Sequence, residues 1–180
     1  MRSVIEAGAI GINIEDSRHE TKELLPIPAQ VERLKAVRKL RDALDVPFVI
    51  NARTDALSLA PGEPEARLAE AIRRGTAYRD VGVDCLYPMG LTDPESIAGY
   101  VKAVEFPINV MIRKGLPSIA ELQRLGVARV SFGPSASYAT MGLLRRASAE
   151  VLERGTYATL LDGAISYDEL NRLASPRRGS

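Results

Sequence analysis

Short apolar runs alternate with longer segments of helical spacing along the whole chain. Five such runs can be read from the sequence, at residues 9–14, 48–51, 85–87, 108–112 and 127–132. A polar turn follows each run, and then comes a segment in which apolar residues recur every three or four positions. This alternation is typical of an α/β fold in which helices connect parallel strands.

The segments between the runs predict amphipathic helices at residues 30–44, 64–81, 94–104, 118–125 and 137–153. In the second of these segments, Leu68, Ile72 and Tyr78 lie on one stripe, as expected for a helix that packs against a sheet. Polar capping residues or a proline in the first turn open the later helices, which supports their starting points.

The last part of the chain has a different character. A short helix is expected at residues 167–173, with Ser166 as its cap, before a disordered "SPRRGS" end. We therefore predict a β/α domain at residues 1–154 and a helical extension with a tail at residues 155–180.

Two architectures place helices between parallel strands, an open doubly wound sheet and a closed (β/α)8 barrel of the TIM type. The Gly-rich turn that binds dinucleotides in many open sheets is missing after the first run. Polar residues instead recur at the ends of the runs, namely Glu15, Asp16, Asn51, Arg53, Asp55, Asn109, Ser131 and Ser135. A barrel collects its active-site groups at the carboxyl ends of its strands in this way, so we predict the barrel type.

The charges of the chain nearly cancel, with 24 Lys and Arg residues against 23 Asp and Glu residues. The basic residues are interleaved with acids and make no patch for nucleic acid. We recognise no signal peptide and no apolar span long enough to cross a membrane. The single cysteine, Cys85, is interpreted as an inert core thiol that cannot form an internal disulfide. We therefore predict a cytoplasmic protein without nucleic-acid or membrane partners.

The first run ends in two adjacent carboxylates, Glu15 and Asp16. A carboxylate at the end of an apolar strand must be solvated, paired or bound to a metal, because an isolated desolvated charge is costly. Glu15 could therefore accept Mg²⁺ or its coordinated waters. The alternatives are a structural pair of Glu15 or Asp16 with Arg53, or a capping role for Asp16 in the next turn.

The other candidates follow the second and fourth runs. The guanidinium of Arg53 is suited to bidentate binding of a substrate carboxylate, but it could equally form a structural ion pair with Asp55 or Glu15. The amide of Asn109 could bind a substrate oxygen or could close the strand–helix turn. His19, the only histidine, lies in the polar loop "SRHETKELLP" and is expected to be a solvated residue, with an acid–base role as the alternative.

Five motifs follow one another along the chain: "GAIGINIEDS", "PFVINARTDA", "GVDCLYPMGLTD", "PINVMI" and "LGVARVSFGPSASYATMGLLRRA". Their order and spacing resemble the isocitrate lyase and phosphoenolpyruvate mutase superfamily over nearly the whole chain. The resemblance implies a (β/α)8 barrel that binds Mg²⁺ and a small α-keto or α-hydroxy carboxylic acid. It also implies a C–C or P–C bond lyase or mutase with an enolate-like intermediate, whose oxyanion the metal stabilises.

The resemblance assigns roles to three residues. Glu15 matches the glutamate of the fourth barrel strand, which helps to hold Mg²⁺ through water. Arg53 matches the arginine that clamps the substrate carboxylate, and Asn109 matches a substrate-binding asparagine of the seventh strand. We therefore expect Arg53 and Glu15 to be catalytic, Arg53 and Asn109 to bind substrate, and Glu15 to bind the metal.

The sequence also departs from the best-known members. Methylcitrate-cycle lyases have a glutamate where this chain has Met89 and a threonine near Met111, whereas the phosphonate-forming mutases have a histidine near Met89. The loop that carries His19 lacks the Lys-Cys-Gly-His type motif of the lyases. Neither of the two familiar specificities is therefore expected.

The first three strands of the family, with the aspartates that bind Mg²⁺ directly, have no counterpart here, because residues 8–15 correspond to strand four. The chain then covers about strands 4 to 8, a partial barrel. We expect this truncated or degenerate form to be inactive by itself. Its unpaired edges and exposed apolar faces predict a chain that is unstable or associates, and we expect a homo-oligomer. The alternative is a noncatalytic half-barrel that binds a carboxylate or serves as an interaction subunit.

Overall fold

The structure is a computed structural model that describes residues 1–175, and it divides into two compact units. The first unit covers Met1–Gly133 and the second begins at Pro134. The predicted tail at residues 176–180 lies outside the described residues. The domain boundary predicted after residue 154 coincides with the end of a helix and stays a prediction.

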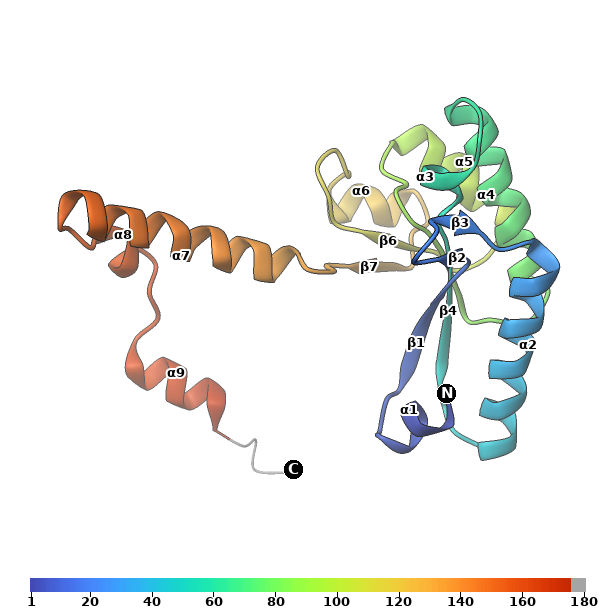
Figure 1. Ribbon diagram of the computed structural model, residues 1–180, viewed down its shortest axis with the longest axis horizontal. Helices are drawn as coiled ribbons and strands as arrows, with labels where there is room; N and C mark the ends of the chain where they lie inside the picture. The colour runs from blue at the N-terminus through green and yellow to red at the C-terminus, as the bar shows by residue number, and fades with distance from the viewer. Residues whose placement is uncertain (176–180) are drawn as a thin grey trace. The chain divides into compact units, whose positions relative to one another are not determined.

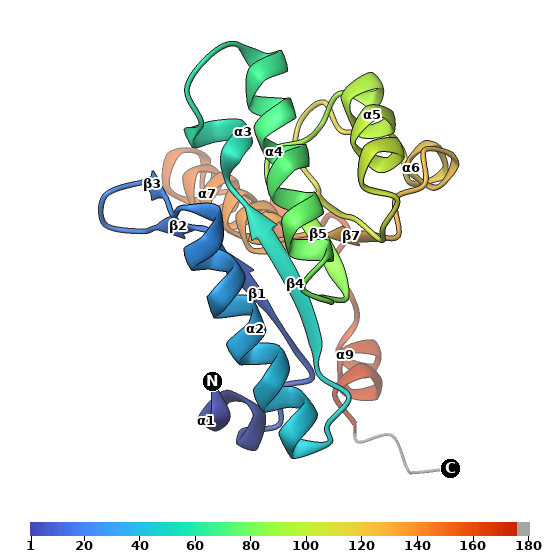
Figure 2. The same cartoon turned by 90° about the vertical axis from the view of Figure 1, so that its right-hand side faces the viewer.

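Parallel strands make the sheet of the first unit (Figures 1 and 2). The pairing order is β1 (Gly11–Glu15), β4 (Val49–Thr54) and β5 (Cys85–Pro88), and β6 (Asn109–Met111) pairs with β7 (Arg129–Ser131). A parallel bridge between Leu86 and Ile108 joins the two groups. The strands therefore follow one another in chain order, as the apolar runs predicted, and their carboxyl ends share one edge.

The helices after these strands bury apolar residues against the sheet. They are α2 (Ile27–Leu44), α4 (Pro64–Arg79), α5 (Pro94–Val104) and α6 (Ile119–Arg124), and all four lie close to their predicted bounds. The side chain of Asp93 accepts a hydrogen bond from the backbone N–H of Ser96 at 2.8 Å and so caps α5. Ser118 caps α6 through the N–H of Glu121 in the same way.

The buried face of α4 differs from the predicted stripe. Leu68 and Ile72 are only partly buried, and the face that packs inward consists of Ala71, Arg74, Gly75 and Tyr78. Gly75 lies directly against Tyr100 of α5, so closely that a Cβ at this position would overlap the tyrosine hydroxyl. Tyr100 is fully buried, and its hydroxyl occupies the space that the missing side chain of Gly75 leaves.

Several short elements of the first unit were not predicted: α1 (Arg2–Glu6), β2 (Ser17–Arg18), β3 (Glu23–Leu24) and α3 (Ala56–Leu59). β2 and β3 form a small antiparallel hairpin in the predicted polar loop. The N–H of Leu25 donates to the carbonyl of Asp16 at 2.7 Å and closes the base of this hairpin. The hairpin therefore begins directly at the carboxyl end of β1.

The second unit consists of α7 (Ser135–Arg154), α8 (Ala158–Leu161) and α9 (Tyr167–Ala174). The carboxylate of Glu150 accepts hydrogen bonds from the hydroxyl of Thr156 and from the N–H groups of Ala158 and Thr159, at 2.7–2.9 Å, so it fixes the start of α8 on α7. Ser166 caps α9, as predicted. No helix among residues 1–175 combines the length and the apolar character that a membrane crossing requires.

Candidate functional site

Glu15 and Arg53 face each other at the carboxyl edge of the sheet. They are register partners in the parallel pair of β1 and β4, and the carboxylate Oε2 lies 3.2 Å from the guanidinium Nη1. The sequence placed both residues at strand ends, and adjacent parallel strands bring their ends to the same edge. The structure therefore unites two of the predicted site residues.

Asp55 holds the other side of the Arg53 guanidinium. Both Nε and Nη2 of Arg53 lie 2.8 Å from Oδ1 of Asp55, and the hydroxyl of Ser17 donates to Oδ2. Burial acts to lower the pKa of Arg53, but the hydrogen bond and the charge of Asp55, together with Glu15, outweigh it and leave that pKa raised. Arg53 therefore stays a cation with a fixed orientation.

The ion pairs do not use all donors of Arg53. A guanidinium has five N–H groups, and the contacts with Asp55 and Glu15 engage Nε, Nη2 and Nη1 once each. Two N–H groups, one on each terminal nitrogen, remain for a ligand. A pair of terminal N–H groups suits the two oxygens of a carboxylate.

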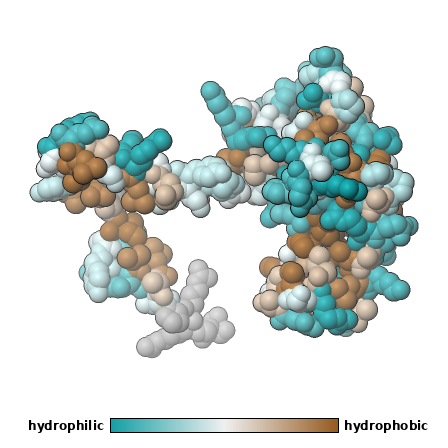
Figure 3. Space-filling view, viewed as in Figure 1, coloured by the Kyte–Doolittle hydropathy of each residue, from teal (hydrophilic) through white to brown (hydrophobic). Residues whose placement is uncertain are grey.

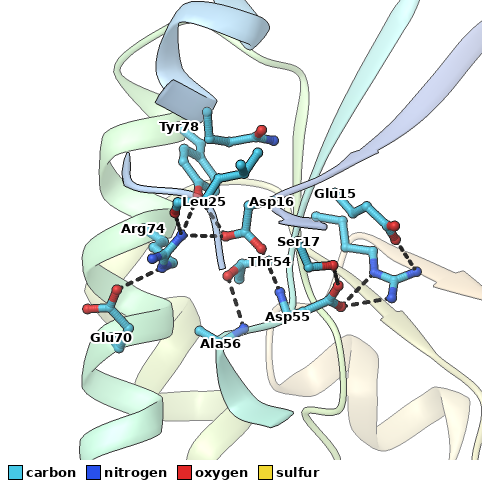
Figure 4. A network of polar contacts seen from close by, with 12 residues as sticks. Glu15, Asp16, Ser17, Leu25, Thr54, Asp55, Ala56, Glu70, Arg74 and Tyr78 are labelled. Carbon is cyan, nitrogen blue, oxygen red and sulfur yellow. Dashed lines mark hydrogen bonds and ion pairs between the residues drawn. The ribbon is translucent and has the colours of Figure 1, made fainter. Parts of the chain in front are cut away.

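A buried polar network lies behind this rim (Figure 4). Asp16 is fully buried, and its Oδ2 accepts hydrogen bonds from Arg74 Nη1 at 3.0 Å and from the Tyr78 hydroxyl at 2.7 Å. Its Oδ1 accepts from the backbone N–H of Asp55 at 2.9 Å. Asp16 thus pairs with Arg74 of α4 and with a backbone group, and neither predicted role, a pair with Arg53 or a turn cap, applies to it.

Arg74 connects this network to the hairpin. Its Nη1 also donates to the carbonyl of Leu25 at 2.9 Å, and its Nε donates to Glu70 at 2.7 Å. Burial acts to lower the pKa of Arg74, whereas Tyr78, Asp16 and Glu70 raise it, with a net increase. The charge of Arg74 therefore persists in the interior and fixes the end of the hairpin beside the site.

A cavity of about 280 Å³ opens at this edge of the sheet. Its lining includes Glu15, Arg53 and Asp55 from the strand ends, and His19 and Lys22 from the hairpin. His19 is almost fully exposed, with Nδ1 3.8 Å from Oε1 of Glu15, in agreement with the solvated loop residue that we expected. The lining also includes residues that were not expected from the sequence, among them Arg113 after β6 and Ser58 and Leu59 of α3.

Asn109 does not line this cavity. It is fully buried at the start of β6, where its amide Nδ2 donates to the Ser131 hydroxyl at 3.1 Å and its Oδ1 accepts from Arg129 at 2.6 Å. Both polar atoms of the amide thus have protein partners. The substrate-binding role of Asn109 stays a prediction.

The residues at the rim do not by themselves fit a magnesium site. Mg²⁺ prefers an octahedron of oxygen ligands, often with one or two carboxylates. Glu15 is paired with Arg53, and Asp55 is engaged by Arg53 and Ser17. Within residues 1–175, no group of three or more acidic, histidine or cysteine side chains could hold a metal ion. Glu15 could contribute at most one ligand, directly or through water.

Comparisons with known proteins agree with the motifs. Residues 1–152 match the family model of phosphoenolpyruvate phosphomutase. The chain is 30% identical over 179 residues to 2-methylisocitrate lyase of Escherichia coli K12, which covers 94% of this chain and 58% of that protein. It is 29% identical over 153 residues to oxaloacetate decarboxylase of Marinomonas sp. strain MWYL1, covering 78% and 50% of the two chains.

A solved structure from Burkholderia cenocepacia J2315, of a protein described as a lyase/mutase, superposes with a TM-score of 0.86 and 37% identity. The match covers 97% of this chain and 63% of that one, and it confirms the predicted α/β fold. The chain thus spans between 50% and 63% of the length of these three proteins. By the match of residues 1–152 to the family model, the chain belongs to the phosphoenolpyruvate phosphomutase family.

Proposed function

We propose that this chain carries the carboxylate clamp of a lyase or mutase that acts on a small α-keto or α-hydroxy carboxylic acid. The observation that carries the proposal is Arg53, a cation held by two carboxylates at a cavity, with two N–H groups left for a ligand. The relatives support it, because 2-methylisocitrate lyase and oxaloacetate decarboxylase are both named for small carboxylic acids.

In this proposal the residues of the rim have separate roles. Arg53 binds one carboxylate of the acid through its free N–H groups and so fixes the position of the reacting carbon. Asp55 holds the guanidinium in place from the opposite side, and Glu15 limits its rotation. The predicted Mg²⁺ and the contribution of Glu15 to it remain expectations.

We also propose how the five strands of this chain correspond to those of a complete barrel. We infer that the five strands correspond to strands 4 to 8 of a (β/α)8 barrel, with β1 as strand four. The chain-order pairing and the common carboxyl edge support this assignment. We expect the chain to be inactive by itself, because the described rim offers no more than one carboxylate for a metal.

The alternative is a noncatalytic half-barrel that only binds acids or partner proteins. An assay of the chain with Mg²⁺ and a panel of oxaloacetate, phosphonopyruvate and 2-substituted malates distinguishes the two, together with calorimetry of oxalate as an enolate mimic. Oxalate binding that strengthens with Mg²⁺ and is lost in Arg53→Ala supports the enzyme. Turnover by the chain supports the enzyme and contradicts its inactivity. Oxalate binding that neither Mg²⁺ nor Arg53→Ala changes, without turnover, supports the noncatalytic half-barrel.

We also propose that the protein is a homo-oligomer. β1 and β7 are the outer strands of the described sheet, and Ile10, just before β1, is 82% exposed. In the second unit, apolar side chains are exposed on α7, α8 and α9, as the brown atoms over these helices show (Figure 3). They include Met141, Leu152, Leu161, Tyr167 and Leu173. Burial between copies would remove this apolar surface from water, and sedimentation velocity measures the resulting mass.

A further inference from the structure

The cavity beside Arg53 carries an excess of positive charge. Four cationic side chains line it, from Arg18, Lys22, Arg53 and Arg113. Two carboxylates, Glu15 and Asp55, also line it, and both are already paired with Arg53. Apart from His19, four positive and two negative charges leave +2 in the lining. A single carboxylate of a ligand would neutralise only half of this excess, so the electrostatics favour a dianion.

Arg113 follows the end of β6 by two residues. Its guanidinium extends to the end of β5, since a Cβ built on Gly90 would be 3.4 Å from Arg113 Nη1. Gly90 has a φ of +102°, a conformation that favours glycine, and the missing side chain leaves room for this approach.

Tyr87, within β5, responds to both arginines. Burial raises the pKa of the Tyr87 hydroxyl, and a hydrogen bond with Ser131 and the positive charges of Arg53 and Arg113 oppose this rise. The guanidinium of Arg53 lies over the same ring, 5.9 Å from its centre. The two arginines therefore approach one end of β5 from β4 and from the segment after β6.

The two arginines differ in what holds them. Arg53 is fixed by Asp55 and Glu15, whereas no carboxylate in the described part of the chain lies within 4.0 Å of the Arg113 guanidinium. Arg113 is exposed and can direct its fork of donors into the cavity. Met89 and Leu59 also line the cavity and give it an apolar part against which a short carbon skeleton can pack.

We propose that Arg113 is a specificity-determining residue that binds a second anionic group of the substrate, while Arg53 binds the first. This inference rests on the proposed function, because it assumes the clamp at Arg53. The preferred substrate is then a short acid with two anionic groups. The second group is a carboxylate or a phosphonate, both of which match the planar fork of a guanidinium. Met89 provides neither charge nor hydrogen-bond donors, and among the other cations of the lining Arg113 is the one that the contact at Gly90 places near the end of β5.

The test compares three acids that share one skeleton: lactate with one anionic group, malate with a second carboxylate, and phosphonolactate with a phosphonate in that place. Their affinities for the full chain and its variants are measured by calorimetry at low ionic strength. Arg113→Gln is expected to weaken malate or phosphonolactate binding by about tenfold or more, the value of a charge-assisted hydrogen bond. Lactate affinity should not change.

Lys114→Gln is the matched control, since it removes a neighbouring exposed cation that does not line the cavity. It should leave all three affinities unchanged, and Arg53→Lys should weaken all three. The relative losses for malate and phosphonolactate in Arg113→Gln identify the second group. One outcome contradicts only the role of Arg113. In it, Arg53→Lys weakens binding, but Arg113→Gln changes the affinities for lactate and malate equally or changes neither. The inference about Arg113 is then wrong, while the clamp at Arg53 is supported. If none of the acids binds, the proposed function fails and the inference fails with it.

Discussion

The buried carboxylate of Asp16 accepts a hydrogen bond from the backbone N–H of Asp55 at 2.9 Å. This bond joins the interior network of α4 to the rim, because Asp55 is also the residue that orients Arg53. The position of the clamp therefore depends on an ion pair in the core, and not only on the strand that carries Arg53.

The ion pair between Asp16 and Arg74 should contribute strongly to stability. Asp16→Ala leaves the buried Arg74 without this partner and removes the acceptor for Tyr78 and Asp55, so we expect a loss of about 3–5 kcal/mol in the free energy of unfolding. Asp80→Ala is the control, since Asp80 pairs with Arg79 at a similar 2.9 Å but is 62% exposed. It should cost less than about 1 kcal/mol. Urea denaturation measures both, and equal losses would contradict a dominant effect of burial.

The contact of Gly75 with Tyr100 predicts opposite effects for two glycine substitutions. Gly75→Ala forces a methyl group into the space of a buried tyrosine and should destabilise the protein by about 1–3 kcal/mol. Gly99→Ala lies in the helix α5 with nothing within 4 Å of the new methyl group. It should stabilise the protein by up to about 1 kcal/mol through helix propensity. Thermal unfolding measures the melting temperatures of the two variants. A lower melting temperature in both would contradict the explanation by close packing of Gly75 against Tyr100.

The order of the strands and helices could be predicted because parallel strands are buried on both faces and read as apolar runs. Ile50, Leu86 and Val110 are examples, each fully buried. The hairpin of β2 and β3 was missed because strands of two residues show no periodicity. Its position depends on the bond of Leu25 to Asp16, a contact that no local pattern records.

The site was predictable only where strand ends meet. Glu15 and Arg53 were expected together since adjacent parallel strands place their ends at one edge. Arg74 was missed because an arginine on an amphipathic helix is normally solvated. The one signal was its spacing of four residues from both Glu70 and Tyr78, which places the three on one face. The partners of Asn109 could not be foreseen from the sequence. Its amide contacts Ser131 and Arg129, which lie about 20 residues further along the chain on the neighbouring strand β7.

The second unit should lose stability in acid through Glu150. Hydrogen bonds from Thr159 and Thr156 lower the pKa of this carboxyl from 4.5 to about 2. A depressed folded pKa stabilises the folded state above the unfolded pKa, and this contribution disappears as the pH falls from about 4.5 toward 2. Glu150→Gln should therefore lower the melting temperature of the second unit at neutral pH, with a difference that shrinks over this range.

Glu153→Gln changes an exposed carboxylate of the same helix and provides the control. It should give a melting temperature close to that of the unmodified protein at every pH. A constant difference between Glu150→Gln and the unmodified protein from neutral pH down to pH 2 would show that the charge of Glu150 is not involved.

Cys85 should be unreactive in the folded protein. Burial, and to a smaller extent Asp84, raise the pKa of its thiol to about 11, although the charge of Arg129 acts in the opposite direction. At about pH 8 the thiol is then protonated as well as buried, and only the thiolate is a good nucleophile. An aromatic disulfide reagent should label the protein rapidly in denaturant and very slowly without it. Equal rates would place Cys85 at the surface.

The affinity of oxalate for the chain and for Arg53→Lys tests the central claim most directly. Lysine keeps the positive charge but lacks the planar fork, so the comparison isolates the geometry of the clamp. We predict saturable binding of oxalate to the unmodified chain, weakened about tenfold or more by Arg53→Lys, while Lys114→Gln changes nothing. Equal affinities of the unmodified chain and Arg53→Lys, or no binding of oxalate to either, would contradict the assignment of Arg53 as the carboxylate clamp.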